Sequence, residues 1–158
     1  MWKIALVLLL FVALGGLFVY QNYFINDNKK MSNDSGLLKV GDNAIYVADQ
    51  KPSSFILISL ISLDKNGYVV IYDDVQGKPG NIIGSTKILP KGESKLIIAG
   101  LIRPTISGEI LFAVLHQDSG DSIFTPSLDI PFRDEDGNII SMSFNINRDA
   151  SEVKEVSF

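Results

Sequence analysis

The only histidine of the chain, His116, stands two residues before a carboxylate, Asp118. Residues two apart point to the same face of a regular strand, so these side chains could act together. Histidine and aspartate are two members of a nucleophilic triad, which makes an extracytoplasmic hydrolase using His116 and Asp118 one hypothesis. A triad also needs an activated serine, and the chain has no G-x-S-x-G motif; Ile83-Gly84-Ser85 matches only part of it. We therefore favour a structural role for His116 and predict that the protein is not an enzyme.

Asp118, Asp121 and Asp129 form a second group of interest, in a part of the chain where carboxylates outnumber basic side chains. If folding brought them together, Ca²⁺ or a basic partner would relieve their mutual repulsion. The segment 134–138 superficially resembles the start of an EF-hand loop, but its glycine comes two places early and Asn145 stands where a bidentate glutamate is required. Exposed carboxylates on loops usually stay apart and hydrated. We therefore expect no metal and no cofactor, with these three aspartates as calcium ligands only in the alternative case.

Missing residue types exclude other chemistries. The chain contains no cysteine, which excludes disulfides, cysteine zinc sites and thiol catalysis. Blue copper needs two histidines and a cysteine, so it is excluded as well. The formal net charge of -4 offers no basic surface for a phosphate backbone, and nucleic acid is therefore not an expected partner.

An uninterrupted apolar run, Ile4 to Tyr20, lies almost at the N-terminus. As a helix it would extend about 25 Å, close to the hydrocarbon thickness of a bilayer. The A-x-A-like triplet at residues 13–15 lies in the middle of the run, where cleavage of a signal peptide is not expected. We predict a transmembrane signal anchor over residues 1–25 that contacts the membrane through residues 4–20. Its short N-terminal tail would be cytoplasmic and the rest of the chain extracytoplasmic.

The remaining chain divides by composition into a polar, flexible stalk over residues 26–41, a domain over 42–148 and a C-terminal tail over 149–158. Short apolar runs separated by Gly, Pro, Asn and Asp predict an all-β domain. Seven strands are expected, as in an immunoglobulin-like or fibronectin-like sandwich. Their ranges are 44–48, 55–63, 68–72, 82–89, 95–99, 109–117 and 138–146.

Turn residues and apolar parity add detail to this prediction. Asn66-Gly67 suits a two-residue hairpin turn between the strands beginning at 55 and 68. Residues 78–80 and 90–92 read as turns on either side of the strand at 82–89. In the runs at 55–63 and 109–117 apolar side chains occur at both odd and even positions, and therefore on both faces of the strand. These strands should be covered on both faces, by loops or by a partner.

Several motifs resemble a β-sandwich domain of unknown function found in surface and exported proteins of archaea and bacteria. They are ADQ at 48–50, GYVVIYDD at 67–74, NIIGSTKILPKGE at 81–93 and ILFAVLHQD at 110–118. The similarity covers roughly residues 44–146, and the segment 122–126 departs from the usual continuation. The resemblance implies a sandwich fold and a surface location, and it implies no activity.

We expect a membrane-anchored extracytoplasmic β-sandwich module for binding or for envelope or surface assembly, without catalysis. The module would bind a protein partner or take part in a surface assembly. The alternatives are the hydrolase described above and a pilin-like filament subunit. The latter is disfavoured because the short charged leader ending in glycine is missing.

Overall fold

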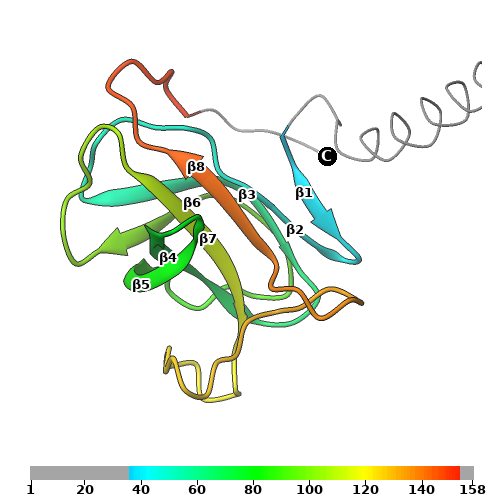
Figure 1. Cartoon of the computed structure of the whole chain (residues 1–158). Coiled ribbons are helices and arrows are strands. Elements are labelled where there is room, and N and C mark those ends of the chain that lie inside the picture. The colour runs from blue at the N-terminus through cyan, green and yellow to red at the C-terminus, as the bar shows by residue number, and fades with distance from the viewer. Residues whose placement is uncertain (1–35, 154–158) are drawn as a thin grey trace, which may run out of the picture. The chain divides into compact units, whose positions relative to one another are not determined.

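The computed structural model describes residues 36–153, which form an all-β structure (Figure 1). Apart from Gly36, these residues belong to one compact unit that begins at Leu37. Within this described range, no helix is long and apolar enough to span a bilayer. The predicted anchor at 1–25, residues 26–35 of the predicted stalk and residues 154–158 of the predicted tail lie outside it.

Eight strands form one antiparallel sheet in the order β1-β2-β3-β6-β5-β4-β7-β8. In chain order they are β1 (Leu38–Val40), β2 (Asn43–Tyr46), β3 (Phe55–Leu63), β4 (Gly67–Val75), β5 (Lys78–Ser85), β6 (Gly92–Leu101), β7 (Ile110–Gln117) and β8 (Ser141–Asn145). The all-β prediction is therefore confirmed.

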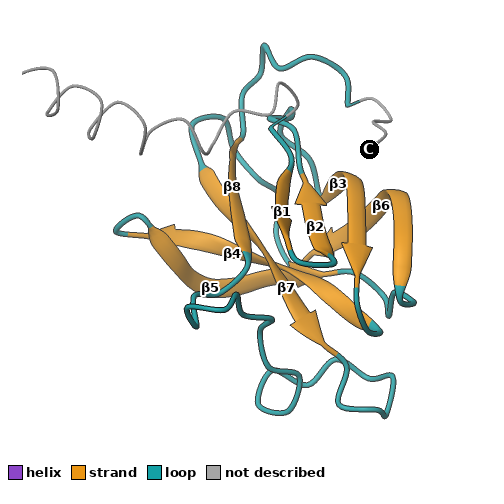
Figure 2. Ribbon diagram, turned by 90° about the vertical axis from the view of Figure 1, so that its right-hand side faces the viewer, coloured by secondary structure: helices purple, strands orange, loops and turns teal. Residues whose placement is uncertain are grey.

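The sheet consists of two four-stranded halves that curl toward each other. One half is β1-β2-β3-β6 and the other is β5-β4-β7-β8, with β3 and β6 on one side in Figure 2 and β4 and β5 on the other. At β5 and β6 the halves are joined by two ladder pairs, Gly84 with Leu101 and Ser85 with Gly100, and by the hydrogen bond from Ile102 N–H to the oxygen of Ile83. At the other side a parallel bridge joins Gln50 to Ile146, so the sheet is nearly closed.

The hydrophobic core is one cluster of buried side chains that both halves supply. Each fully buried aliphatic side chain contributes about 1.5–3 kcal/mol relative to an exposed one. Members from the strands include Ile45, Ile56, Ile58, Ile61 and Leu63 of the first half and Val69, Ile71, Leu111, Ala113, Leu115 and Phe144 of the second.

The strand number and the start of the domain differ from the prediction. Eight strands in a single sheet replace the expected seven, and β1 lies inside the segment predicted as a stalk. Leu38 and Val40 pack against the core, and Leu38 is paired with Ile45 of β2. The polar surroundings of this short strand hid it, because three residues are too few to show a periodic pattern.

The turns predicted at Asn66-Gly67 and at residues 78–80 are wrong, because these residues form hydrogen bonds or strand pairs with other parts of the chain. Gly67 exchanges backbone hydrogen bonds with Leu89, at 3.0 and 2.8 Å, and the Asn66 side chain accepts the N–H of Lys91. The β3 and β4 strands are therefore not a hairpin. Residues 78–80 lie within β5, and the β4–β5 turn is formed by Gln76 and Gly77, whose φ values of 57° and 77° suit a type I′ turn.

Candidate functional site

His116 lies near the end of β7 and is buried, with 2% of its surface exposed. Its Nδ1 is 2.5 Å from the main-chain oxygen of Asp129, and its Nε2 is 3.0 Å from the hydroxyl of Tyr72. A carbonyl only accepts, so Nδ1 carries the hydrogen and Nε2 accepts from Tyr72. Burial lowers the pKa of His116, which favours the neutral ring. Through these two hydrogen bonds, His116 of β7 connects β4 with the loop that follows β7.

No hydrogen bond joins Asp118 to His116 in the described part of the chain. The Asp118 carboxylate accepts the hydroxyl of Tyr68 at 3.3 Å and the N–H of Ser122 at 3.0 Å. Among the residues described, no serine or threonine hydroxyl is bonded to His116, and both ring nitrogens already have partners. The arrangement lacks the free base and nucleophile that hydrolysis through His116 and Asp118 would require.

The loop from Asp118 to Pro131 protrudes beyond the end of β7 (yellow in Figure 1) and packs on β4 and β7 at Tyr68 and His116. The ring of Phe124 lies edge-on to His116, with centroids 5.7 Å apart, and 5.3 Å from the ring of Tyr68. Such aromatic pairs add about 0.5–1.5 kcal/mol beyond burial. The loop thus covers β7 at His116, near the end of the strand.

Asp129 fixes the shape of this loop from inside. Its side chain is fully buried, and its two oxygens accept the N–H groups of Ser119 at 2.8 Å and Thr125 at 2.6 Å. Burial raises the pKa of Asp129, but these N–H groups outweigh it and hold the pKa below its ordinary value. The carboxylate is therefore a buried anion stabilised by the main chain of its own loop.

Asp118, Asp121 and Asp129 converge, contrary to the expectation that they stay apart. One carboxylate oxygen of each lies within 4.8 Å of the others. Such spacing would allow three carboxylates to share a hard cation. Each carboxylate also accepts backbone N–H groups of the loop, with that of Ile123 bonded to Asp121 at 2.9 Å. The carboxylates also affect the neighbouring Tyr68. Burial of its hydroxyl, and to a smaller extent the negative charge of these aspartates, raises the pKa of Tyr68 to about 12.

Backbone donors already offset part of the repulsion among these carboxylates, so we expect calcium to add little. Millimolar CaCl₂ should leave the melting temperature of the protein within about 1 °C of its value in MgCl₂, whereas a site occupied at 100 times Kd would add about 2.7 kcal/mol. Differential scanning calorimetry measures this. A rise of several degrees that requires Ca²⁺ and disappears in Asp121→Asn would contradict the expectation.

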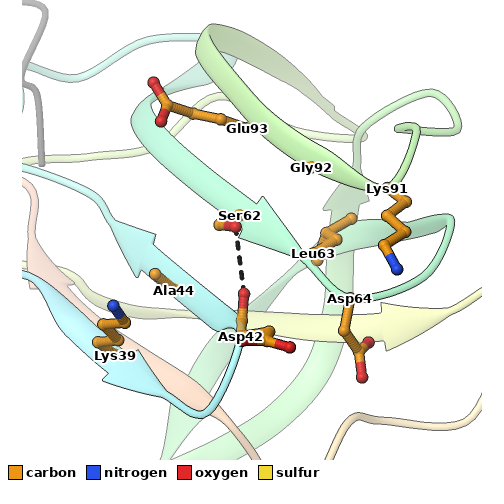
Figure 3. Close-up of a pocket in the computed structure, with 9 residues that line it drawn as sticks. All are labelled: Lys39, Asp42, Ala44, Ser62, Leu63, Asp64, Lys91, Gly92 and Glu93. Atoms are coloured by element: carbon orange, nitrogen blue, oxygen red, sulfur yellow. Dashed lines mark hydrogen bonds between the residues drawn. The ribbon is translucent and has the colours of Figure 1, made fainter.

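A shallow depression of about 400 Å³ lies elsewhere, beside the ends of β3 and β6 (Figure 3). The Ser62 hydroxyl donates to the main-chain oxygen of Asp42 at 3.1 Å along its floor. Two lysines and three carboxylates line it, so neither sign of charge dominates. The lining residues are Lys39, Asp42, Ala44, Ser62, Leu63, Asp64, Lys91, Gly92 and Glu93. These residues do not form a base–nucleophile pair, and the depression is a weaker candidate than the loop.

The ADQ motif has a structural role that sequence reasoning missed. Gln50 is 6% exposed, and its side-chain amide donates to the carbonyls of Ala48 and Leu57 and accepts the N–H of Leu57. Its main chain bonds to that of Asn145, whose N–H also reaches the Asp49 carboxylate at 2.8 Å. No local signal reveals these contacts, because Asp49 and Asn145 are 96 positions apart.

These observations define a small all-β module whose polar motif residues close a sheet and fix a loop. The chain belongs to the family described as a domain of unknown function (DUF7282), whose model matches residues 43–147. Comparison with curated proteins and with solved structures gave no match.

Proposed function

We propose that this protein is a membrane-anchored extracytoplasmic module that binds a protein partner through the Asp118–Pro131 loop, without catalysis. The observation that carries the proposal is the exposure of three large apolar side chains on one anchored loop. Ile123, Leu128 and Ile130 are 67%, 58% and 57% exposed. Apolar side chains gathered on an ordered loop are a common mark of an interaction site.

The hydrogen bonds within the loop support its proposed role in binding a protein partner. Asp129 and His116 hold it against β4 and β7, so its conformation is set before a partner arrives. A preorganised loop loses little conformational entropy on binding. The neighbouring carboxylates of Asp118 and Asp121 favour a partner that combines apolar groups with a lysine or arginine, because an acidic partner would be repelled.

The anchored, extracytoplasmic location rests on the sequence. The apolar run from Ile4 to Tyr20 is long enough to span a bilayer, and the motifs resemble those of surface and exported proteins. A pilin-like filament has no comparable support. The hydrolase alternative is disfavoured by the engaged nitrogens of His116.

Cross-linking on intact cells tests location and binding face together. A membrane-impermeant amine cross-linker should join the full chain to another protein, and the double variant Ile123→Ser/Leu128→Ser should lower that yield at least about fivefold, since loss of one well-packed anchor costs about 1 kcal/mol or more. Ile98→Ser is the matched control, because Ile98 is 58% exposed outside the loop.

The two parts of the proposal fail differently in this experiment. A wild-type chain that reacts only after cells are permeabilised would contradict the extracytoplasmic location. Equal yields for the wild type and the double variant would contradict the loop as the binding face.

A further inference from the structure

Two isoleucines are strongly exposed on the β6–β7 loop, which comprises residues 102–109. Ile102 is 81% exposed, the largest exposed fraction of any large apolar side chain that the structure describes, and Ile106 is 66% exposed. Hydrogen bonds fix the conformation of the loop. The Glu109 carboxylate accepts the N–H of Ile106 at 3.0 Å, and the buried Thr105 exchanges hydrogen bonds with Ser53. Exposed apolar side chains on an ordered loop mark a contact site.

The β6–β7 loop lies at the end of the domain where the chain enters β1. The N–H of Gly108 bonds to the oxygen of Ile146, directly after β8, at 2.7 Å. Gln50, toward which β2 leads, also bridges to Ile146, and β1 is antiparallel to β2, so β1 begins on this side. Figure 1 shows the end of β8 and the start of β1 at the same upper end, and the Asp118–Pro131 loop at the lower end. The two loops with exposed apolar side chains are therefore at opposite ends of β7.

The length of chain before β1 limits how far this end can be from a bilayer. The apolar run that predicts an anchor ends at Tyr20, and the described structure begins at Gly36. A polypeptide of about 16 residues spans at most about 55 Å in any conformation. In an anchored chain the bilayer is therefore always within reach of the β6–β7 loop, and a short tether gives it an effective concentration in the millimolar range. The anchor thus makes the bilayer the apolar phase that this loop meets continuously.

Charge distinguishes the two loops. In the β6–β7 loop the only charged side chains are Arg103 and Glu109, which form an ion pair at 2.8 Å. The Asp118–Pro131 loop carries three carboxylates and no basic side chain. Anionic headgroups repel carboxylates, and moving an unpaired charge into a bilayer is costly. The β6–β7 loop can therefore approach lipid headgroups, whereas the opposite loop is disfavoured there.

We infer that the β6–β7 loop is a lipid-contact site, with Ile102 and Ile106 inserted at the boundary between headgroups and acyl chains of the bilayer that anchors the chain. Apolar side chains of surface-bound segments occupy this depth. Two side chains bury too little area to hold a domain on a membrane alone, so the contact depends on the tether. The inference rests on the anchor of the proposed function and adds an orientation, in which the Asp118–Pro131 loop points away from the membrane toward its partner.

Lipid-borne quenchers test this contact, because the chain has no cysteine of its own and accepts a single label at a chosen position. The full chain with a fluorophore on Ile106→Cys is inserted into phosphatidylcholine vesicles whose acyl chains carry bromine, which quenches only on close approach. We expect at least a fivefold larger fractional quenching than for a label on Ile123→Cys in the opposite loop. Position 123 is the matched control, since Ile123 is 67% exposed and Ile106 is 66% exposed.

A second variant separates the contact of the loop from any affinity of the fluorophore for lipid. Ile102→Asp, added to the chain labelled at position 106, should lower the quenching at least threefold, because a carboxylate is costly to bring into the lipid interface. Ile139→Asp is its control and should leave the quenching unchanged, since Ile139 is exposed and lies before β8, at the opposite end. Far-UV circular dichroism checks that both variants are folded.

Failure of the anchor and failure of the inference give different results. Chain that is released from the vesicles by carbonate would contradict the anchor and, with it, the lipid contact. Chain that stays inserted but shows equal quenching at positions 106 and 123, or quenching that Ile102→Asp leaves unchanged, would overturn the inference alone. Shielding of the label at position 106 from aqueous iodide in cell membranes, without quenching in vesicles, would assign the loop to a protein partner and would overturn it too.

Discussion

Replacing Gln50 by alanine is expected to lower the free energy of unfolding by about 3 kcal/mol, because the N–H and C=O of Leu57 would lose their partners in a nearly dry site. The melting temperature should fall by more than about 10 °C. Thermal denaturation followed by circular dichroism measures the change. The loss of the bond to Ala48 would add to the effect.

Lys51→Ala is the matched control, one residue along the chain. Lys51 forms an ion pair with Glu152 at 2.8 Å, and both side chains are exposed. Exposed ion pairs contribute little to stability, so the unfolding midpoint should not change measurably. A Gln50→Ala protein as stable as the control would show that closure of the sheet at Gln50 and Ile146 does not depend on this side chain.

Replacing Asp129 by asparagine should cost about 2–3 kcal/mol, because the amide keeps only one acceptor oxygen: one hydrogen bond becomes neutral and the other, charge-assisted and worth about 1.5–3 kcal/mol, is lost. The amide would place an NH₂ group opposite the N–H of Ser119 or Thr125. Hydrogen exchange should then speed up within the Asp118–Pro131 loop before the strands respond. Asp136→Asn, at an exposed turn, is the control and should leave exchange unchanged.

The same aspartate gives stability a pH dependence with a definite sign. Its pKa in the folded protein lies below the ordinary value of 3.8, so the unfolded chain binds the proton more readily. The stabilisation from Asp129 is fully present above that ordinary value and is lost as the pH falls through the folded pKa. Urea titrations from pH 6 to pH 2 should show a smaller acid loss in Asp129→Asn than in the wild type. Equal losses would contradict the assignment.

The strands that the sequence predicted best are those with continuous apolar runs. Residues 55–63 form β3 as predicted, and β7 at 110–117 differs by one residue from the expected range. The composition also predicts burial on both faces, which the strands show over residues 58–61 and 113–116, whereas Phe55 and Ile110 at their first positions are exposed. The β1 strand was missed because its three residues are stabilised by pairing with β2 and not by a pattern of their own.

The site was less predictable because distant residues create it. Asp118, Asp121 and Asp129 were recognised as a group, but their convergence depends on a loop that Asp129 itself holds from inside. Asn66-Gly67 has the composition of a hairpin turn, yet its hydrogen bonds go to residues 89–91. In both cases tertiary partners, which local sequence does not show, decide the outcome.

The contact that closes the sheet also governs when folding can finish. Gln50 and Ile146 come from opposite ends of the folded region, and so do Asp49 and Asn145, 96 positions apart. Contacts with such high sequence separation form late, because the entropy of closing the intervening chain must be lost first. A nascent chain would expose the unpaired edge of β7 until β8 had emerged, and exposed strand edges promote aggregation. The last few strand residues to leave the ribosome therefore end the period in which this domain is most prone to aggregate.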